Sequence, residues 1–177
     1  MLETHSEAEL LPILICPDPK LRKVARAVTP DDAEDLRELI PDMFATMYKA
    51  PGIGLAAPQV GRLLRVITVD VAPNDEPAPI ALINPEIIAK SEETAVHQEG
   101  CLSVPDQYAE VTRPARVAVR YLDENWTKRE IEADGLLSAC LQHEIDHLNG
   151  VLFVDYLTPL KRNILLRKLA KAQKDKK

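Results

Sequence analysis

Residues 142–150 of the chain read QHEIDHLNG and contain the pattern His-Glu-x-x-His at His143, Glu144 and His147. On a helix, side chains four positions apart project from the same face, so the two imidazoles can bind one metal ion. Glu144 then lies beside the ion, where its carboxylate can accept a proton from a metal-bound water. A surface helix that carries two histidines and an acid by chance is the alternative, because short motifs give false positives.

The overall composition is typical of a globular protein, with 46% hydrophobic and 28% charged residues in a chain of 177. A chain of this length can bury a substantial core, and we predict one domain over residues 1–177, in which residues 1–12 form a loose N-terminal segment. No apolar run of about 18 residues occurs, so we expect no membrane span. The acidic N-terminus lacks the basic region and apolar stretch of a secretion signal, which favours a cytoplasmic protein.

Charge is distributed unevenly along the chain, which has a formal net charge of −6. Residues 160–177 contain eight lysine and arginine residues against one acid, Asp175, so this segment carries +7 and the remainder −13. The acidic remainder argues against general or sequence-specific nucleic-acid binding. The basic segment, in contrast, is suited to contact with an anionic partner.

Helices are expected before, at and after the histidine motif. The first should run over residues 29–49, with a threonine cap, a proline in its first turn and a kink at Pro41. The motif helix should begin at 134–135 and end near residue 148, before an Asn-Gly pair. A last helix is expected over residues 159–174, with an apolar stripe of Leu160, Ile164, Leu165 and Leu169.

Strands are expected between the first helix and the motif helix, because β-branched residues cluster there. The predicted strands are residues 64–71, 80–88, 117–122 and 128–131, with 123–125 as the turn of the last hairpin. Residues 51–61, PGIGLAAPQVG, form a Gly-rich turn that allows close approach by a ligand or by another element, plain tight packing being the alternative. We therefore predict an α+β fold.

A catalytic zinc-type site holds its metal with three protein ligands and leaves one position open. Phe153 stands where one protease class has its third histidine, and neither histidine nor glutamate occurs after residue 147. Cysteine is the remaining ligand type, and the three cysteines are too few for a disulfide framework. Cys140 shares the ligand face of the helix, whereas Cys101 follows Gly100 just past a predicted strand. The spacing does not choose between these thiols, and a buried apolar role for Cys140 is the alternative.

Three segments, in this order, resemble the motifs of the peptide deformylases: GIGLAAPQ at residues 52–59, EGCLS at 99–103 and QHEIDH at 142–147. The similarity extends from about residue 11 to the closing helix. The resemblance implies mostly antiparallel strands packed around a central helix that carries the motif. It also implies that the metal ligands are Cys101, His143 and His147.

The peptide deformylases remove the formyl group from the N-terminal methionine of newly made polypeptides. The resemblance implies attack by a metal-bound hydroxide on the formyl carbon, with Glu144 as general base and then general acid. It implies that the Gln59 side chain and the Leu102 backbone N–H stabilise the oxyanion. It further implies that Cys140 lines the substrate pocket.

The methionine side chain of an N-formylmethionyl nascent peptide needs an apolar slot beside the metal. On the motif helix, one continuous face leads to the ligands through Leu136, Ala139, Cys140 and His143. By resemblance, Ile53 and the residue at position 97 close this slot from the other side. Gly54 suits close pairing with the substrate backbone, and Gly100 lets the chain come near the metal.

Two positions depart from the usual family pattern. His97 stands where an aliphatic residue is more common, and we expect its side chain to turn to solvent. Tyr108 stands where an arginine often helps to hold the peptide.

Buried charged groups are expected to support the ligands. By resemblance, Glu99 and Arg113 form a buried or half-buried pair that supports the loop of Cys101. Asp146 either accepts the second N–H of a metal-bound histidine or faces solvent.

A thiolate with two imidazoles suits zinc, iron or nickel. The resemblance implies Fe²⁺, with Zn²⁺ or Ni²⁺ as substitutes, and the basic residues 160–177 are a candidate docking element for the ribosome. Two other functions stay open at this point. One is a general metalloprotease, and the other is a structural zinc module in which Cys140 closes the site as a fourth ligand.

Overall fold

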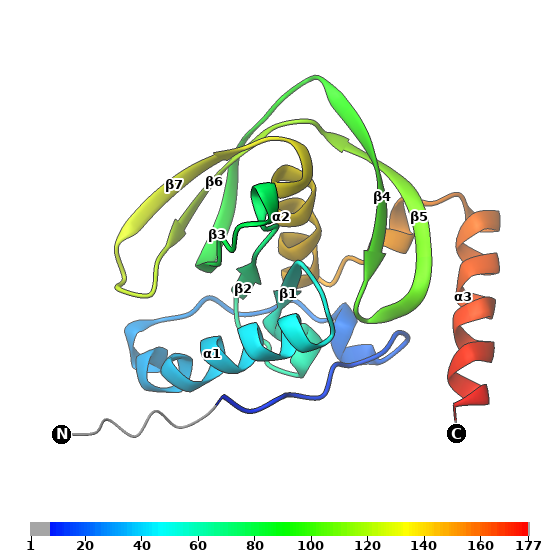
Figure 1. Cartoon of the computed structure of the whole chain (residues 1–177), viewed down its shortest axis with the longest axis horizontal. Helices are drawn as coiled ribbons and strands as arrows, with labels where there is room; N and C mark the ends of the chain where they lie inside the picture. Colours follow the sequence, from blue (N-terminus) through cyan, green and yellow to red (C-terminus); the bar gives the residue numbers. More distant parts are fainter. Residues whose placement is uncertain (1–7, 177) are drawn as a thin grey trace.

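The computed structural model describes residues 8–176, in which five strands form one antiparallel sheet and two strands form another (Figure 1). The larger sheet has the strand order β1-β2-β3-β6-β7. Its strands are β1 (Gly54–Ala56), β2 (Val66–Val69), β3 (Ile80–Lys90), β6 (Val117–Leu122) and β7 (Lys128–Ala133). The smaller sheet pairs β4 (Thr94–Cys101) with β5 (Val104–Pro114).

Helices make up most of the remaining regular structure in the described part of the chain. The α-helices are α1 (Ala33–Lys49), α2 (Gly135–Leu148) and α3 (Pro159–Asp175). Short 3-10 turns are η1 (Pro19–Arg22), η2 (Pro30–Asp32), η3 (Ala57–Val60), η4 (Pro73–Asp75) and η5 (Phe153–Tyr156). Within residues 8–176, we find no helix with the length and apolar character needed to cross a membrane.

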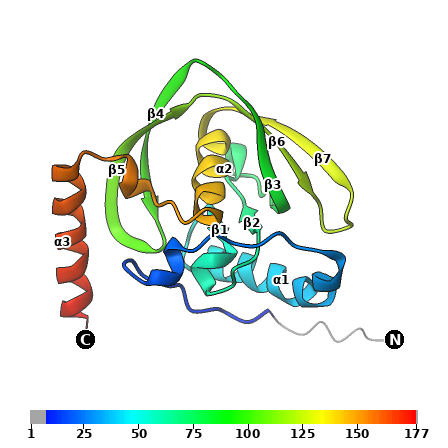
Figure 2. The same cartoon turned by 180° about the vertical axis from the view of Figure 1, so that it is seen from behind.

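Helix α2, which carries the histidine motif, is enclosed between the larger sheet and the β4–β5 hairpin (Figures 1 and 2). Ten of its 14 residues are buried, so almost every side of the helix has a packing partner. Its residues Leu141 and Leu148 pack in one cluster with Ile67 and Val119 of the larger sheet. Its polar side faces the β4–β5 hairpin. Close packing on both sides fixes the directions in which the motif side chains point.

The C-terminal end of α2 is held by distant parts of the chain. The backbone carbonyl of Leu148 accepts hydrogen bonds from the Ala25 N–H at 2.8 Å and from Arg65 Nη1 at 3.1 Å. Gly150 has a φ of +74°, and a Cβ on this residue would collide with the backbone of Arg22. Only glycine fits a position that is both left-handed and crowded, so the predicted end of the helix is confirmed.

The predicted helices and the four predicted strands are confirmed, with small differences in their bounds. The first helix begins as the 3-10 turn η2, where the Thr29 N–H donates to Asp32 Oδ2 at 2.9 Å. Pro41 lies inside α1. The Gly-rich turn contains a strand, β1, and the sequence prediction did not include β4 and β5, the hairpin that carries Cys101.

Helix α3 packs on β5 at the edge of the molecule (Figure 1). Leu165 and Leu169 belong to one apolar cluster with Val104 of β5. The predicted apolar stripe is wrong for its other members, because Leu160 and Ile164 are 72% and 45% exposed. A helix that covers a single strand buries a narrower stripe than a helix enclosed on both sides.

The predicted loose N-terminal segment falls partly on residues 1–7, which lie outside the described residues. Residues 8–12 form no helix or strand. They are held against α1, because the Glu9 N–H donates to Asp42 Oδ1 at 2.8 Å and the Leu11 N–H donates to Thr46 Oγ1 at 2.9 Å.

Candidate metal centre and active site

Three candidate ligands from two elements converge beside α2. The Sγ atom of Cys101 and one ring nitrogen each of His143 and His147 lie within 4.8 Å of one another. Cys101 Sγ is 3.3 Å from His147 Nε2, and the centroids of the two imidazole rings are 5.0 Å apart. The i, i+4 spacing on α2 accounts for the histidine pair, and Cys101 comes from the end of β4. Three such ligands can surround one divalent ion.

The end of the β4–β5 hairpin determines where Cys101 lies. The pairing of the two strands shifts its register between Gly100 and Cys101. A Cβ on Gly100 would lie 2.5 Å from the ring of Tyr108, so glycine is needed for this tyrosine to cover the strand. The N–H of Cys16 donates to the carbonyl of Ser103 at 2.9 Å and ties the turn to the N-terminal segment.

A buried ion pair supports the candidate ligand His143. Arg113 of β5 donates from Nε and Nη2 to the carboxylate of Glu99 in β4, at 2.6 and 2.9 Å, and both side chains are less than a tenth exposed. Glu99 Oε1 also lies 2.9 Å from His143 Nδ1, which leaves Nε2 to face the metal position. Burial raises the pKa of Glu99, but the contacts with Arg113 and His143 outweigh burial and lower this pKa to about 2. The predicted buried pair is confirmed.

Asp146 plays neither of its predicted parts. Its Oδ2 accepts hydrogen bonds from Arg113 Nη1 at 2.9 Å and from the Tyr156 hydroxyl at 2.7 Å. It therefore supports the ion pair instead of contacting a ligand histidine. In the part of the chain that the structure describes, His147 Nδ1 is buried without a hydrogen-bond partner.

The two candidate ligand histidines differ in the pKa of their imidazoles. Burial lowers the pKa of His143, but the neighbouring Glu144, Cys101 and Glu99 outweigh burial and raise it well above its ordinary value. Burial and the charge of His143 lower the pKa of His147 well below its ordinary value. A metal ion binds neutral imidazole, so the neighbours that raise the pKa of His143 would oppose metal binding there more than at His147.

Glu144 lies beside the ligands without belonging to the ligand group. Its side chain is buried, and within residues 8–176 its Oε1 has no hydrogen-bond partner, although it is 3.9 Å from His147 Nε2. Burial raises the pKa of Glu144 to about 7, so this carboxylate can take up and release a proton near neutral pH. Strand β1 passes close to it, since a Cβ on Gly54 would lie 2.5 Å from Glu144 Oε2 and 2.8 Å from Cys140 Sγ.

Gln59 places an amide N–H beside the ligand thiol. Its Oε1 accepts a hydrogen bond from the Ala56 N–H at 2.9 Å, which fixes the orientation of the amide. Its Nε2 then donates to Ser103 Oγ at 3.1 Å and lies 3.5 Å from Cys101 Sγ. Leu102, in the turn after β4, lines the same cavity as Gln59.

A cavity of about 740 Å³ opens beside the ligands. Its wall contains all the predicted substrate-binding residues, namely Ile53, Gly54, His97, Gly100, Leu136, Ala139 and Cys140. Ile53 and Leu136 are 42% and 50% exposed and lie at the rim, whereas Ala139 and Cys140 are buried. The cavity therefore suits an apolar side chain that enters from solvent and ends near the ligands.

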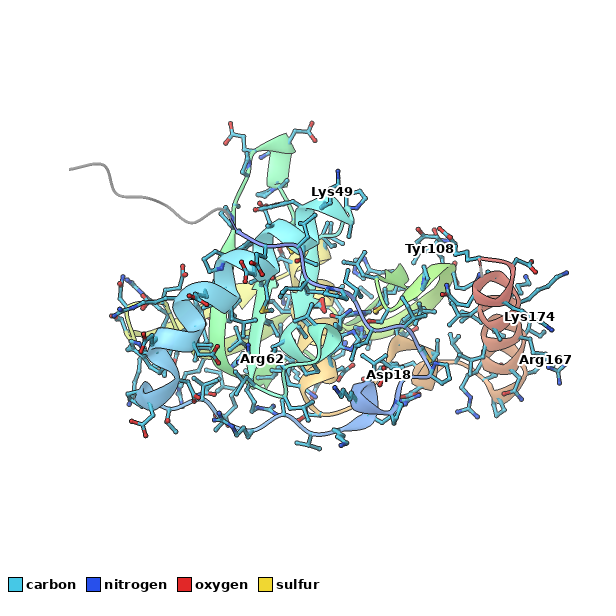
Figure 3. The ribbon with its side chains drawn as sticks, turned by 90° about the horizontal axis from the view of Figure 1, so that it is seen from below. Asp18, Lys49, Arg62, Tyr108, Arg167 and Lys174 are labelled. Atoms are coloured by element: carbon cyan, nitrogen blue, oxygen red, sulfur yellow. The ribbon has the colours of Figure 1, made fainter. Side chains whose placement is uncertain are left out.

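His97 does not have its predicted orientation. It is half-buried, lines the cavity and stands two residues before Glu99, so the two side chains share one face of β4. The prediction that it turns to solvent is wrong, because the outer face of this strand is taken by Val96, which is 58% exposed. Tyr108, the other departure from the family pattern, lies at the wall of the cavity and on the side of the hairpin near α3 (Figure 3).

Cys140 lies outside the group of converging ligand atoms. Its Sγ is 3.7 Å from the carbonyl oxygen of Ile53, and the residue is buried in the cavity wall. Burial, together with the charges of Glu144 and Glu99, raises the pKa of its thiol well above the ordinary value. Because metals bind the thiolate, this environment disfavours Cys140 as a ligand.

The site also includes residues outside the predicted set. Phe153 of η5 stacks on His143 with ring centroids 6.1 Å apart. The motif spacing contained a signal for this contact, because Phe153 stands where one protease class has its third ligand. Ile13 and Ile15 of the N-terminal segment line the cavity. The spacing of two positions between Ile13 and Ile15 was the sequence signal that could have placed both side chains on one face of an extended segment.

The donor set fits a divalent transition metal. Zinc, iron and nickel all accept one thiolate and two imidazoles as ligands. Next to these donors lies Glu144 Oε1, a buried carboxylate oxygen without a hydrogen-bond partner among the described residues. Three protein ligands leave a coordination position open, which is typical of catalytic rather than structural sites. The fold and the site together define a metal-dependent hydrolase.

Comparison with known proteins identifies the family within that class. Residues 10–163 match the family described as polypeptide deformylase, and the chain belongs to this family. A peptide deformylase of Mesorhizobium japonicum is 56% identical over 166 residues, which cover 93% of this chain and 94% of the relative. A peptide deformylase of Rhizobium meliloti is 52% identical over 164 residues, covering 92% and 94%.

Solved structures show the same fold. The crystal structure of a peptide deformylase from Legionella pneumophila has a TM-score of 0.88 and 47% identity, covering 94% of this chain and 97% of that one. The peptide deformylase from Ehrlichia chaffeensis in complex with actinonin has a TM-score of 0.88 and 41% identity, covering 93% and 98%. The predicted fold, antiparallel strands around a central motif helix, is confirmed.

Proposed function

We propose that Cys101, His143 and His147 hold the metal ion with which this chain, as a member of its family, removes the formyl group from the N-terminal methionine of newly made polypeptides. The convergence of the three ligand atoms within 4.8 Å, beside a buried carboxylate, carries the proposal. A divalent ion at this position supplies Lewis acidity and lowers the pKa of a bound water from about 16 toward 7. Formate and a free amine are the products.

Glu144 moves the proton in this reaction. Its carboxylate is buried and has a pKa of about 7, so it is poised to accept a proton from the attacking water. It then delivers this proton to the amine that leaves. General base and general acid are thus the same residue, used in sequence. The absence of a competing hydrogen bond to Oε1 within the described residues supports this role.

Gln59 donates a hydrogen bond to the oxygen on which negative charge develops. Its amide is held by Ala56 and Ser103, so the Nε2–H is oriented before the substrate arrives. The backbone N–H of Leu102 is the second donor. Loss of one such donor typically raises the activation barrier by about 3 kcal/mol.

The cavity wall recognises the substrate. Ile53 and Leu136 at the rim, with Ala139 and Cys140 further in, contact the methionine side chain. His97 and Gly100 border the same space.

The substrate backbone has an edge strand to pair with. Strand β1 is the outermost strand of the larger sheet, and its first residue, Gly54, lines the cavity, so an extended peptide can pair with it. We treat residues 1–177 as a single catalytic domain, since the ligands and the cavity draw on both sheets and on α2.

We propose Fe²⁺ as the metal in the cell, with Zn²⁺ or Ni²⁺ as substitutes. The mixed thiolate and imidazole set supports a metal of this group, and affinity order alone does not choose among the three. Anaerobic purification, metal analysis and activity per bound metal test the assignment. Full activity with zinc alone would contradict the choice of iron.

We further propose that the protein works in the cytoplasm and docks on the ribosome through the basic surface of α3. Arg167 and Lys174 are exposed on the side of α3 that faces away from the rest of the molecule, which supports contact with an anionic partner (Figure 3). Ribosome binding should weaken as salt is added and should weaken further in an Arg167→Gln, Lys174→Gln variant. Binding that is unaffected by both changes would count against this docking surface.

The two rival functions lack such support. A structural zinc module requires a closed site, usually with four protein ligands, and Cys140 lies outside the ligand group. A general metalloprotease would cut internal peptide bonds, whereas the deformylase reaction leaves the chain whole.

Formate release from formyl-Met-Ala-Ser, measured for the wild type and for Glu144→Gln, tests the proposal. The variant should lose about 10²–10⁴-fold in kcat, because it can no longer transfer the proton. It should keep its metal, because Glu144 is outside the ligand group. Glu110→Gln, a change at an exposed position of β5, is the matched control and should retain full activity. Equal activity of Glu144→Gln and the wild type would overturn the assignment.

A further inference from the structure

We propose that Tyr156 is a positioning residue for the metal ligand His143, although it lies outside the cavity wall. It belongs to η5, the short turn that follows the motif helix. The inference rests on the proposed metal site, because it concerns how one ligand of that site is held. Tyr156 itself takes no part in the proposed reaction and acts only through the position of His143.

Tyr156 contacts two charged groups at once. Its hydroxyl donates a hydrogen bond to Asp146 Oδ2 at 2.7 Å. Asp146 Oδ2 also accepts a hydrogen bond from Arg113 Nη1 at 2.9 Å. The guanidinium carbon of Arg113 also lies 4.7 Å from the centroid of the Tyr156 ring, within the range of a cation–π contact. The tyrosine therefore holds the carboxylate of Asp146 and one face of the guanidinium in a defined arrangement.

The planar guanidinium transmits this arrangement inward. Its Nη1 faces Asp146, while Nε and Nη2 donate to Glu99 at 2.6 and 2.9 Å, respectively. Because the guanidinium is rigid, a change in the direction of Nη1 also turns the two groups that hold Glu99. Glu99 Oε1 in turn lies 2.9 Å from His143 Nδ1. The orientation of the ligand ring thus depends on a chain of contacts that ends at Tyr156.

The two outer members of this chain of contacts are more exposed than the two inner ones. Tyr156 is 49% exposed and the Asp146 side chain 22%, whereas Arg113 and Glu99 are 4% and 7% exposed. Asp146 is consequently the carboxylate that can turn to solvent, and the Tyr156 hydroxyl opposes that movement together with Arg113 Nη1. The loss of this hydroxyl would leave the buried Arg113 with a less constrained partner.

A second contact from the same turn supports the assignment. Phe153, three residues before Tyr156, stacks on the His143 ring with centroids 6.1 Å apart. The turn η5 therefore touches the ligand directly through Phe153 and indirectly through Tyr156. Both contacts act on the same imidazole.

The chain contains a matched control for the tyrosine. Tyr48 of α1 is also 49% exposed, and its hydroxyl donates to Asp70 Oδ2 at 2.6 Å. Asp70 otherwise accepts hydrogen bonds from the backbone N–H groups of Ala72 and Ala78, and none of its hydrogen bonds within residues 8–176 involves a candidate metal ligand. Tyr48→Phe and Tyr156→Phe thus each remove one tyrosine–aspartate hydrogen bond of similar exposure, but only one of them lies next to the metal site.

The test is the transfer of Zn²⁺ from the zinc-loaded protein to a competing chelator. Tyr156→Phe should raise the metal dissociation constant by about 3–10-fold, less than the 10–100-fold typical when a direct partner of a ligand is lost. Tyr48→Phe should change it by less than about 2-fold, while both variants show a similar shift of the urea midpoint. Equal dissociation constants for the two tyrosine variants would overturn the proposal. Cys101→Ser in the same assay separates this outcome from failure of the metal site, because unchanged zinc affinity in that variant would contradict the proposed function itself.

Discussion

Helices α2 and α3 have similar lengths, 14 and 17 residues, but ten residues of α2 are buried against only two of α3. Helix α2 lies between the larger sheet and the β4–β5 hairpin, while α3 packs against β5 at the edge of the molecule (Figures 1 and 2). The candidate ligands His143 and His147 and the proposed proton carrier Glu144 are on the first helix. The excess positive charge of the C-terminal segment is on the second.

This difference in burial determines which of the two helices can hold reactive side chains in a fixed geometry. On α2, burial raises the pKa of Glu144 to about 7, and the surrounding side chains fix the direction of each ligand. On α3, an exposed side chain keeps its rotamer freedom, so it is suited to contacts that depend on charge rather than on exact geometry. We infer that α2 provides the reaction centre, whereas α3 provides a charged surface for contact with a partner.

The largest predicted effect concerns the ion pair beside α2. Glu99→Gln should lower the unfolding free energy of the metal-free protein by about 3–5 kcal/mol near neutral pH, because it leaves Arg113 buried without its partner. The folded-state pKa of Glu99 is about 2, against an ordinary value of 4.5. A lowered pKa contributes stability that is fully present above about pH 4.5 and is lost as the pH falls through about 2. The difference between the two values corresponds to about 3 kcal/mol.

Urea unfolding of the two proteins between pH 7 and pH 2 measures this effect. The gap between wild type and Glu99→Gln should shrink by about 3 kcal/mol as the pH falls. Glu130→Gln is the control, because its pair with Arg120 is more than half exposed on both sides and should contribute only about 0–1 kcal/mol. A gap that stayed constant over this pH range would show that the buried pair does not stabilise the fold in this way.

The next effect compares the same substitution on the two helices. Leu141→Ala on α2 should lower the unfolding free energy by about 2–5 kcal/mol, because Leu141 is fully buried and leaves a cavity. Leu160→Ala on α3 should change it by no more than about 0.5 kcal/mol, because Leu160 is 72% exposed. Chemical denaturation of both variants checks the comparison. Similar losses at the two positions would mean that α3 is packed more tightly than its exposure indicates.

Much of the fold could be predicted from the sequence because local signals agree with the packing. The threonine and proline at the start of the first helix, the Asn-Gly stop of α2 and the hairpin of β6 and β7 all follow residue preferences that act over a few positions. The β4–β5 hairpin follows no such pattern. Its inward face carries the charged Glu99 and Arg113 beside the apolar Val111, and its outward face carries Val96, so the usual alternation of apolar inside and polar outside is interrupted.

The site shows the same division. The histidine spacing on one helix predicted two neighbouring ligands, since their separation is a property of the helix. The third ligand could not be chosen by spacing, because Cys101 reaches the site through strand pairing that the sequence pattern does not reveal. The inward orientation of His97 and the contact of Asp146 with Arg113 depend on the same hairpin and were missed for the same reason.

The choice of Cys101 over Cys140 is the central claim, and one measurement tests it directly. Cys101→Ser and Cys140→Ser are purified side by side without oxygen, and the metal content per chain and formate release are measured for each. We predict that Cys101→Ser loses its metal and its activity, while Cys140→Ser retains the metal. Metal that stays with Cys101→Ser and is lost from Cys140→Ser would contradict the proposed site.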